Sequence, residues 1–167
     1  MEIKIKTAYQ DLGAIRELFR EYTDMVVRHD PEFAYYLKLQ RYESELRHLD
    51  EKYGQPQGRL YLVRADGAAA GCIAMKQLDQ TKCEMKRLYI RPAFRGRGLA
   101  RRLVERLLSD AREEGYEAML LDTFPFLKGA LGLYRDLGFY EIPSYNNSPL
   151  DTTIYMRKDL RLLPQAF

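Results

Sequence analysis

Several residue types that mark common protein classes are scarce in this sequence of 167 residues. Cys72 and Cys83 are the only cysteines, too few for a disulfide framework, so we expect an intracellular, cytoplasmic protein. The two histidines, His29 and His48, have no partners at metal-ligand spacing, which argues against a metal site. No run approaches the roughly 18 consecutive apolar residues of a membrane span, so we expect no membrane association.

A block of one charge sign is also missing. The net charge of +3 arises from 27 Lys and Arg residues interleaved with 24 Asp and Glu residues. Nucleic-acid-binding surfaces need clustered basic residues, so that class of protein is disfavoured. The first six residues alternate like an edge strand and lack the apolar core of a signal peptide. The length predicts one domain over residues 1–167.

Residues 84–100 combine the end of an apolar strand with the start of an amphipathic helix. Gly96 and Gly98 lie at the junction, where glycine lets the backbone approach a ligand closely. The first N–H groups of a helix have no partner within the helix, and its dipole favours negative charge there. This turn therefore predicts a phosphate or pyrophosphate site, to which Arg95 and Arg97 add positive charge.

Two common phosphate-binding motifs do not fit this turn. The P-loop requires Gly-Lys-Ser/Thr, which is absent, and the dinucleotide fingerprint requires Gly or Ala where this chain has Arg101. The pattern Arg/Gln-x-x-Gly-x-Gly/Ala does fit, with Arg95, Gly98 and Ala100. It resembles the acetyl-CoA-binding motif of the GNAT superfamily, the acetyl-CoA-dependent N-acetyltransferases. Residues 130–139 also resemble the second signature of that superfamily.

The hydrophobic periodicity divides the chain into strands and helices. We expect strands at residues 2–6, 59–65, 71–77, 82–90, 118–122, 139–142 and 152–157. We expect helices at residues 12–28, 33–53, 99–115 and 126–137. Asp30 and Pro31 would cap and open the second helix, and Asp66-Gly67 predicts a hairpin turn.

This order of elements predicts an α/β fold, a mixed sheet with helices on both faces. Strands 82–90 and 118–122 should be parallel neighbours, because a right-handed helical crossover joins them. The resemblance implies a mostly antiparallel sheet of about seven strands. It also implies that this central parallel pair splays apart around acetyl-CoA.

Acetyl transfer from a thioester to an amine needs a base, an acid and a stabilised carbonyl oxygen. No Ser/His/Asp or Cys/His set is visible, which favours direct attack by the amine. The resemblance implies Glu84 as the base, directly or through a water relay; otherwise it is a strand glutamate paired with Lys82 or Lys86. Tyr134 matches the family tyrosine near the CoA sulfur and would be the acid; otherwise it is a core aromatic.

The resemblance also implies that acetyl-CoA, as co-substrate, contacts the strand end, the glycine turn and the last helix. The implied residues are Leu88, Tyr89, Ile90, Arg95, Gly96, Arg97, Gly98, Leu99, Ala100, Lys128 and Leu131. Leu127 replaces an asparagine that is common in the family, which leaves the role of Lys128 open. The weaker candidates for acceptor binding are Arg28, Tyr35, Tyr36, Arg87 and Tyr145. The loop 143–149 would wall a small pocket.

The leading hypothesis is an acetyl-CoA-dependent N-acetyltransferase that acetylates the primary amine of a small molecule, such as an amino acid or another amine. One alternative is acetylation of a protein N-terminus or lysine. A second is a non-catalytic module that senses acyl-CoA. The acceptor, the acyl chain length and the oligomeric state, including a homodimer, stay open.

Overall fold

The computed structural model describes residues 1–161, in which seven strands form one sheet with the order β1-β2-β3-β4-β5-β7-β6. The strands are β1 (Ile3–Thr7), β2 (Arg59–Ala65), β3 (Ala68–Gln77), β4 (Lys82–Ile90), β5 (Ala118–Thr123), β6 (Tyr140–Ile142) and β7 (Ile154–Asp159). The α-helices are α1 (Leu12–His29), α2 (Phe33–Leu39), α3 (Tyr42–Arg47), α4 (Leu49–Lys52), α5 (Leu99–Glu113) and α6 (Lys128–Asp136). A short 3-10 turn, Pro92–Phe94, follows β4.

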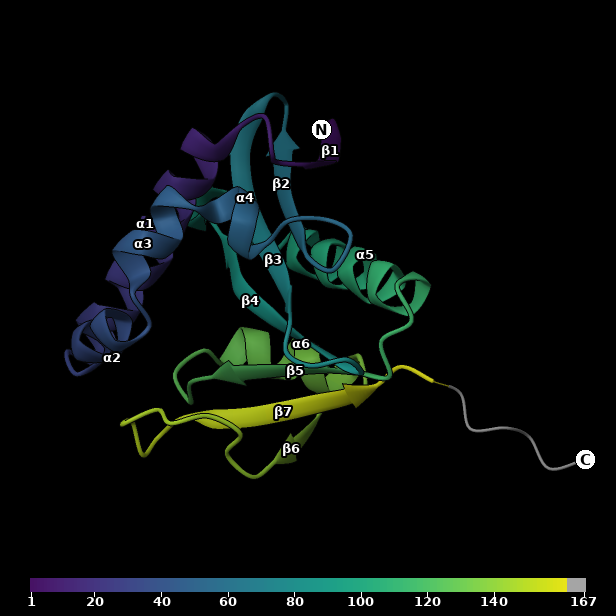
Figure 1. Ribbon diagram of the computed structural model, residues 1–167. Helices are drawn as coiled ribbons and strands as arrows, with labels where there is room; N and C mark the ends of the chain where they lie inside the picture. The colour runs from purple at the N-terminus through teal and green to yellow at the C-terminus, as the bar shows by residue number, and fades with distance from the viewer. Residues whose placement is uncertain (162–167) are drawn as a thin grey trace, which may run out of the picture.

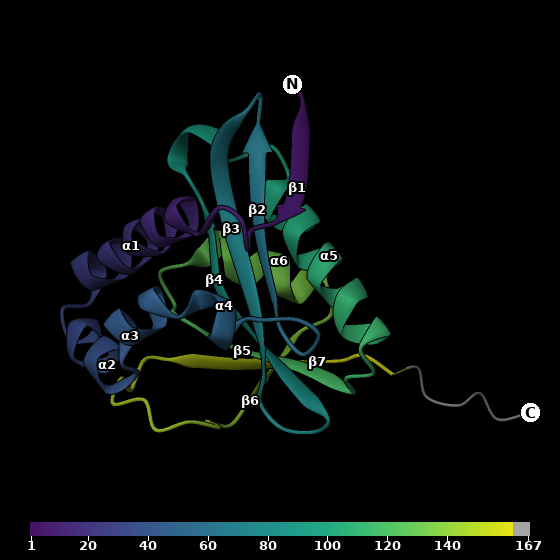
Figure 2. The same ribbon diagram turned by 45° about the horizontal axis from the view of Figure 1, so that its top comes forward.

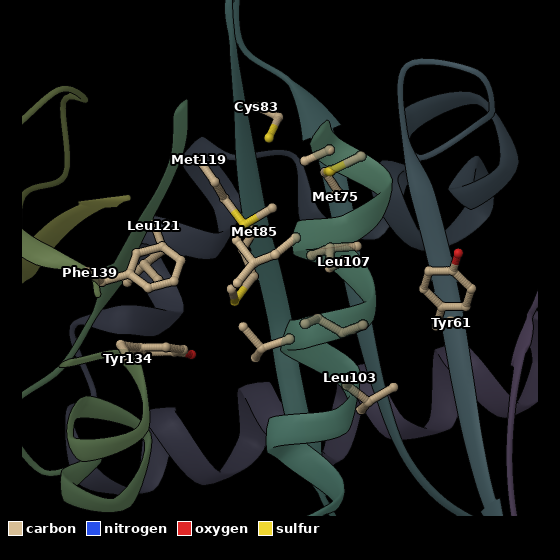
Figure 3. Packing of buried hydrophobic residues seen from close by; sticks show 14 of the residues in the cluster. Tyr61, Met75, Cys83, Met85, Leu103, Leu107, Met119, Leu121, Tyr134 and Phe139 are labelled. Carbon is tan, nitrogen blue, oxygen red and sulfur yellow. The ribbon is translucent and has the colours of Figure 1, made fainter. Parts of the chain in front are cut away.

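Helices cover both faces of the sheet, as Figures 1 and 2 show. Helices α1 to α4 pack on one face around buried residues such as Phe19, Leu46 and Tyr53. Helices α5 and α6 pack on the other, where Leu103 and Leu107 meet the strands (Figure 3). Only β4 and β5 pair in parallel, and every other neighbouring pair is antiparallel. The predicted fold class is confirmed.

The hairpin between β2 and β3 follows the local sequence. Asp66 and Gly67 both have positive φ, 48° and 83°, the backbone that a two-residue type I′ turn requires. Ala65 pairs with Ala68 across this turn. The predicted hairpin is therefore confirmed.

The single helix expected over residues 33–53 is wrong, because the segment forms α2, α3 and α4. The chain breaks at Arg41, which has a left-handed φ of 55°, and again at His48. Each of the three short helices buries large side chains, among them Tyr36, Leu46 and Leu49. A straight helix would turn some of them away from the sheet, so tertiary packing overrides helical continuity here.

Two predicted helix starts also lie too early. Asp30 does not cap α2; its carboxylate accepts the N–H of Glu32 at 3.1 Å, and the helix begins at Phe33. Helix α6 begins at Lys128, with Leu127 as its N-cap, so Pro125 lies in the preceding turn. Local turn bonding before each helix shifts its first residue.

The pairing between β4 and β5 covers only the start of each strand. The last rung joins Glu84 to Leu120, although β4 continues to Ile90 and β5 to Thr123. Beyond that rung the two strands diverge, and both views show β5 running at a steep angle to the upper part of β4 (Figures 1 and 2). The expected splay of the central pair is confirmed.

A β-bulge in β4 lies within the diverging part. Cys72 pairs with Tyr89 but Ala74 pairs with Lys86, so Arg87 and Leu88 together face one residue of β3. Arg87 has a φ of 61°. An extra residue bends the strand and increases its twist, which carries the end of β4 away from β5.

Candidate active site

A cavity of about 400 Å³ lies where β4 and β5 have diverged. Its walls come from residues 85–90 of β4, from Asp122 and Thr123 at the end of β5, from Tyr22 and Met25 of α1, and from residues 126–130, 133 and 134 around α6. Pockets of this size in proteins commonly hold small ligands. The splay thus opens the sheet at its centre, with both helical layers contributing to the wall.

A second cavity of about 470 Å³ adjoins the first and reaches the glycine turn before α5. The two share the lining residues Ile90, Arg95, Ala100, Lys128, Gly129 and Leu133. Together they form a trough that runs from the gap between the strands to the N-terminus of α5. A long, flexible ligand could therefore occupy both.

The glycine turn exposes backbone rather than side chain. Gly96 and Gly98 have φ of 77° and 75°, and a Cβ added at either position would meet nothing within 4 Å. Gly98 is the N-cap of α5 and makes no side-chain cap, so no N-cap side chain bonds the first N–H groups of the helix. These groups and the helix dipole suit an anion.

All of the predicted cofactor-binding residues except Arg97 and Leu131 line one of the two cavities. Arg97 is exposed and its guanidinium reaches the Met1 sulfur at 2.8 Å, while Leu131 is buried in the core. Arg95 donates to the Ile90 carbonyl at 2.9 Å and lies over the Tyr89 ring. Lys128, the residue beside the missing asparagine, lines both cavities.

Tyr134 of α6 lines the first cavity while its ring packs in the apolar core. The ring centroid lies 5.7 Å from that of Phe139, at the edge of the cluster in Figure 3. Its hydroxyl forms no hydrogen bond within residues 1–161. Burial raises the pKa of Tyr134 above its ordinary value, so the phenol is protonated at neutral pH and able to donate.

Glu84 occupies the last position of β4 that pairs with β5, and it is 4% exposed. The hydroxyl of Tyr145 donates to its Oε2 at 2.6 Å, and the ammonium groups of Lys76 and Lys86 lie 3.8 and 3.9 Å from its Oε1. The carboxylate is not part of the cavity lining. A proton from the cavity would therefore need an intervening carrier, such as water, to reach it.

The loop after β6 is bonded to both central strands, to Glu84 near the start of β4 and to Asp122 near the end of β5. Besides the bond from Tyr145 to Glu84, the Asn146 amide donates to Asp122 at 3.0 Å. Tyr155 donates to the Asn146 side chain at 2.8 Å. The loop residues hold two carboxylates in place, but they do not line the cavity themselves.

The remaining predicted acceptor residues are dispersed. Arg87 lines the cavity, but its guanidinium is buried against the Glu45 carboxylate, with contacts at 3.2 Å. Tyr36 is buried on α2 outside the lining, while Arg28 and the 60% exposed Tyr35 lie on the surface away from it. The structure does not bring these four together.

Sequence reasoning missed several cavity residues, chiefly Lys86, Asp122 and Tyr22. A signal existed for Asp122, because it ends a buried strand that runs parallel to β4, and carboxyl ends of parallel strands line ligand sites. Lys86 alternates with Glu84 along one strand face. Nothing local marks Tyr22, which reaches the cavity only through the packing of α1.

Comparison with known proteins identifies this arrangement. Residues 12–139 match the model of the Acetyltransferase (GNAT) family. An uncharacterized N-acetyltransferase of Schizosaccharomyces pombe is 35% identical over 153 residues, covering 90% of each chain. The chain belongs to the GNAT acetyltransferase family, which confirms the resemblance and the expected class of enzyme, an acetyl-CoA-dependent acyltransferase.

Solved structures share the fold. An acetyltransferase from Streptococcus agalactiae superposes with a TM-score of 0.77 at 20% identity, over 95% of this chain and 98% of that one. PaiA N-acetyltransferase from Thermoplasma acidophilum, solved in complex with coenzyme A, gives 0.75 at 19% identity, over 95% and 99%.

Two further findings concern residues 1–161. None of the helices described there is long and apolar enough to cross a membrane. No group of three or more His, Cys, Asp and Glu side chains in that range is arranged to hold a metal ion.

Proposed function

We propose that this protein binds acetyl-CoA along the trough and transfers the acetyl group directly to the primary amine of a small molecule. One observation carries the proposal: the cavity between the splayed strands, with Tyr134 in its wall, is continuous with the glycine turn at α5. The coenzyme A complex of the structurally similar PaiA protein supports the same use of this fold.

The trough fits the chemical parts of acetyl-CoA. The free N–H groups at the start of α5, beside Gly96 and Gly98, suit a pyrophosphate. Arg95 and Lys128 bring positive charge to the same cavity. The apolar stretch from Leu88 to Ile90 lines the narrow gap, where a pantetheine chain would contact strand backbone left unpaired by the splay.

Bound acetyl-CoA supplies a thioester. The acceptor nitrogen forms a bond to the thioester carbonyl carbon, and the carbon–sulfur bond breaks. Starting from the acceptor ammonium, the products are an amide, the CoA thiol and one proton. Tyr134 donates its phenolic proton to the leaving sulfur and recovers one from the nitrogen. Glu84 takes the proton that the ammonium must lose before attack, through a water relay, since its carboxylate lies outside the cavity wall.

The shape of the site favours a small acceptor over a peptide. The first cavity measures about 400 Å³ in total, and part of that volume must take the acetyl end. The loop that carries Tyr145 and Asn146 is bonded to Glu84 of β4 and Asp122 of β5, beside the gap between the two strands. A peptide groove would need an open channel across this edge.

The proposal is tested by calorimetric titration with acetyl-CoA, CoA and NAD, followed by a CoA-release assay over a panel of amines. We expect binding of both CoA forms, none of NAD, and turnover of at least one small amine. Glu84→Gln should keep acetyl-CoA binding and lose about 100-fold in rate. Absence of acetyl-CoA binding would overturn the proposal, and binding with no turnover of any amine or peptide would favour the sensor alternative.

A further inference from the structure

Two charged side chains face each other across the opening between the central strands. Glu84 and Leu120 form the last rung, and side chains alternate along a strand. Two residues further on, Lys86 and Asp122 therefore lie on the same face of the sheet, one on each side of the gap. Both line the cavity. This is the face covered by α1 to α4, because Met85 and Leu121 point into the α5 cluster.

Lys86 is a buried cation that forms no hydrogen bond within residues 1–161 and has only a long ion contact to Glu84. Its side chain is 8% exposed, and its ammonium lies 3.9 Å from Glu84, beyond hydrogen-bond distance. Burial and the neighbouring Arg87 lower the pKa of Lys86, while the carboxylates of Glu84 and Asp122 oppose that shift. A buried ammonium that lacks partners is costly, and an anionic ligand group in the cavity would satisfy it.

Asp122 has the opposite charge and also has few hydrogen-bond partners. Its carboxylate accepts one hydrogen bond, from Asn146 at 3.0 Å, although a carboxylate can accept about four. Within residues 1–161 it forms no ion pair, with Lys86 or any other cation. The nearby guanidinium of Arg87 is bonded to Glu45 instead. The free capacity of Asp122 therefore faces the cavity.

We propose that the acceptor is a free amino acid, whose carboxylate binds Lys86 and whose ammonium binds Asp122. This inference rests on the proposed acetyl transfer. Lys86 and Asp122 lie on opposite sides of the gap and do not pair with each other. A zwitterion carries one group of each charge and could bind both. A plain amine would leave Lys86 unsatisfied, and so would a peptide N-terminus, which has no adjacent carboxylate.

The test compares matched acceptors that differ only in the carboxylate: free amino acids, their amides, and the corresponding decarboxylated amines. We expect kcat/KM to be at least tenfold higher for the best amino acid than for its amide or amine. Lys86→Met should abolish that preference, and Lys86→Arg should restore part of it. Asp122→Asn should slow both members of a pair and leave their ratio unchanged.

Lys76→Met is the matched control, because Lys76 lies 3.8 Å from Glu84 but does not line the cavity. It should keep the preference for the amino acid. Binding without turnover is measured by calorimetric titration of the same acceptors into CoA-saturated protein. There, Lys86→Met should lower the affinity for the amino acid and leave the affinity for the amide unchanged.

Equal kcat/KM and equal affinity for acid and amide would overturn the inference, as would a preference that survives Lys86→Met. Those outcomes leave acetyl transfer itself standing. Failure of the proposed function looks different, since then acetyl-CoA does not bind and no amine releases CoA. If acetyl-CoA binds but turnover is absent, the inference is tested by whether the amino acid binds more tightly than its amide.

Discussion

The two faces of the sheet both bury charge, but they use it differently. On the α5 side, Arg59 and Asp110 are paired with each other and with neighbours near the end of α5, away from the cavity. On the α1–α4 side, Glu45 and Arg87 are likewise paired. At the cavity, within residues 1–161, Lys86 has only a long ion contact to Glu84 at 3.9 Å, and Asp122 has no ion pair. Buried charge that is fully paired holds the fold, and charge that is weakly paired or unpaired at a cavity marks the place for a ligand.

The α5 side contributes to the site in another way. Its part of the trough combines exposed backbone at the glycine turn with apolar side chains and with the charged side chains of Arg95, Arg101, Lys128 and Asp136. Backbone N–H groups recognise an anion without regard to side-chain identity. In the proposed function, donor recognition thus depends on backbone N–H groups, aided by Arg95 and Lys128, and acceptor recognition depends on the charges of Lys86 and Asp122.

The strongest test of this contrast breaks a satisfied pair. Glu45→Ala should cost about 3–5 kcal/mol of unfolding free energy, because it leaves the Arg87 guanidinium buried and unpaired. The double variant Glu45→Leu with Arg87→Met should recover most of that loss. Denaturant unfolding measures both, with Glu43→Ala, from an exposed pair, as a control expected to cost less than about 1 kcal/mol. A double variant no more stable than the single one would contradict this account.

The same pair predicts a pH dependence. Burial alone would raise the pKa of Glu45, but Arg87 and Lys52 outweigh it and lower the pKa from 4.5 to about 2. A depressed pKa contributes stability that is present above the unfolded-state value and lost as pH falls through the folded one. Between about pH 5 and 2 the loss should be roughly 3 kcal/mol. Unfolding of Glu45→Gln should show a correspondingly smaller slope over that range; equal slopes would refute the assignment.

Tyr134→Phe tests whether an unpartnered polar group at the cavity is functional. The rate should fall about 100-fold, about 2.7 kcal/mol in activation free energy. Stability should hardly change, because the hydroxyl has no partner to lose within the described residues. Tyr140→Phe is the control, since Tyr140 is exposed and bonds to Asp159. A rate unchanged by Tyr134→Phe would assign the tyrosine to the core alone.

The smallest effect concerns the backbone side of the site. Gly98→Ala should destabilise the protein by about 1–2 kcal/mol, because φ is +75° there. It should also lower the affinity for acetyl-CoA about tenfold, because the added methyl group narrows the approach to the helix N-terminus. Gly67→Ala, at a φ of +83° in the hairpin turn, should show a similar loss of stability and unchanged affinity in calorimetry. Equal affinity of both variants for acetyl-CoA would show that the glycine turn does not bind this ligand.

Local pattern predicted much of the fold. Strands β2 and β4 begin and end where alternation and turn residues indicate, and the Asp66-Gly67 hairpin follows from backbone preference alone. Helix α5 follows from its apolar stripe. The segment 33–53 failed because its helical periodicity says nothing of where a helix must break to follow the surface of the sheet.

The site divides in the same way. The glycine turn and Tyr134 could be proposed from the sequence, because each belongs to a short motif of consecutive residues. Lys86 and Asp122 could not be paired in advance, because β4 and β5 meet for only three residue pairs. Where that ladder ends depends on a bulge at Arg87 and on packing from both helical layers.

Local sequence accounts for the strand and helix order, the parallel crossover and the anion-binding turn, because each rests on interactions between residues near one another in the chain. Which charges are paired within the fold, and which face the cavity, depends on the tertiary structure. That outcome depends on burial and on partners from distant segments, such as Glu45 for Arg87 and Asn146 for Asp122, and no local pattern encodes those distances.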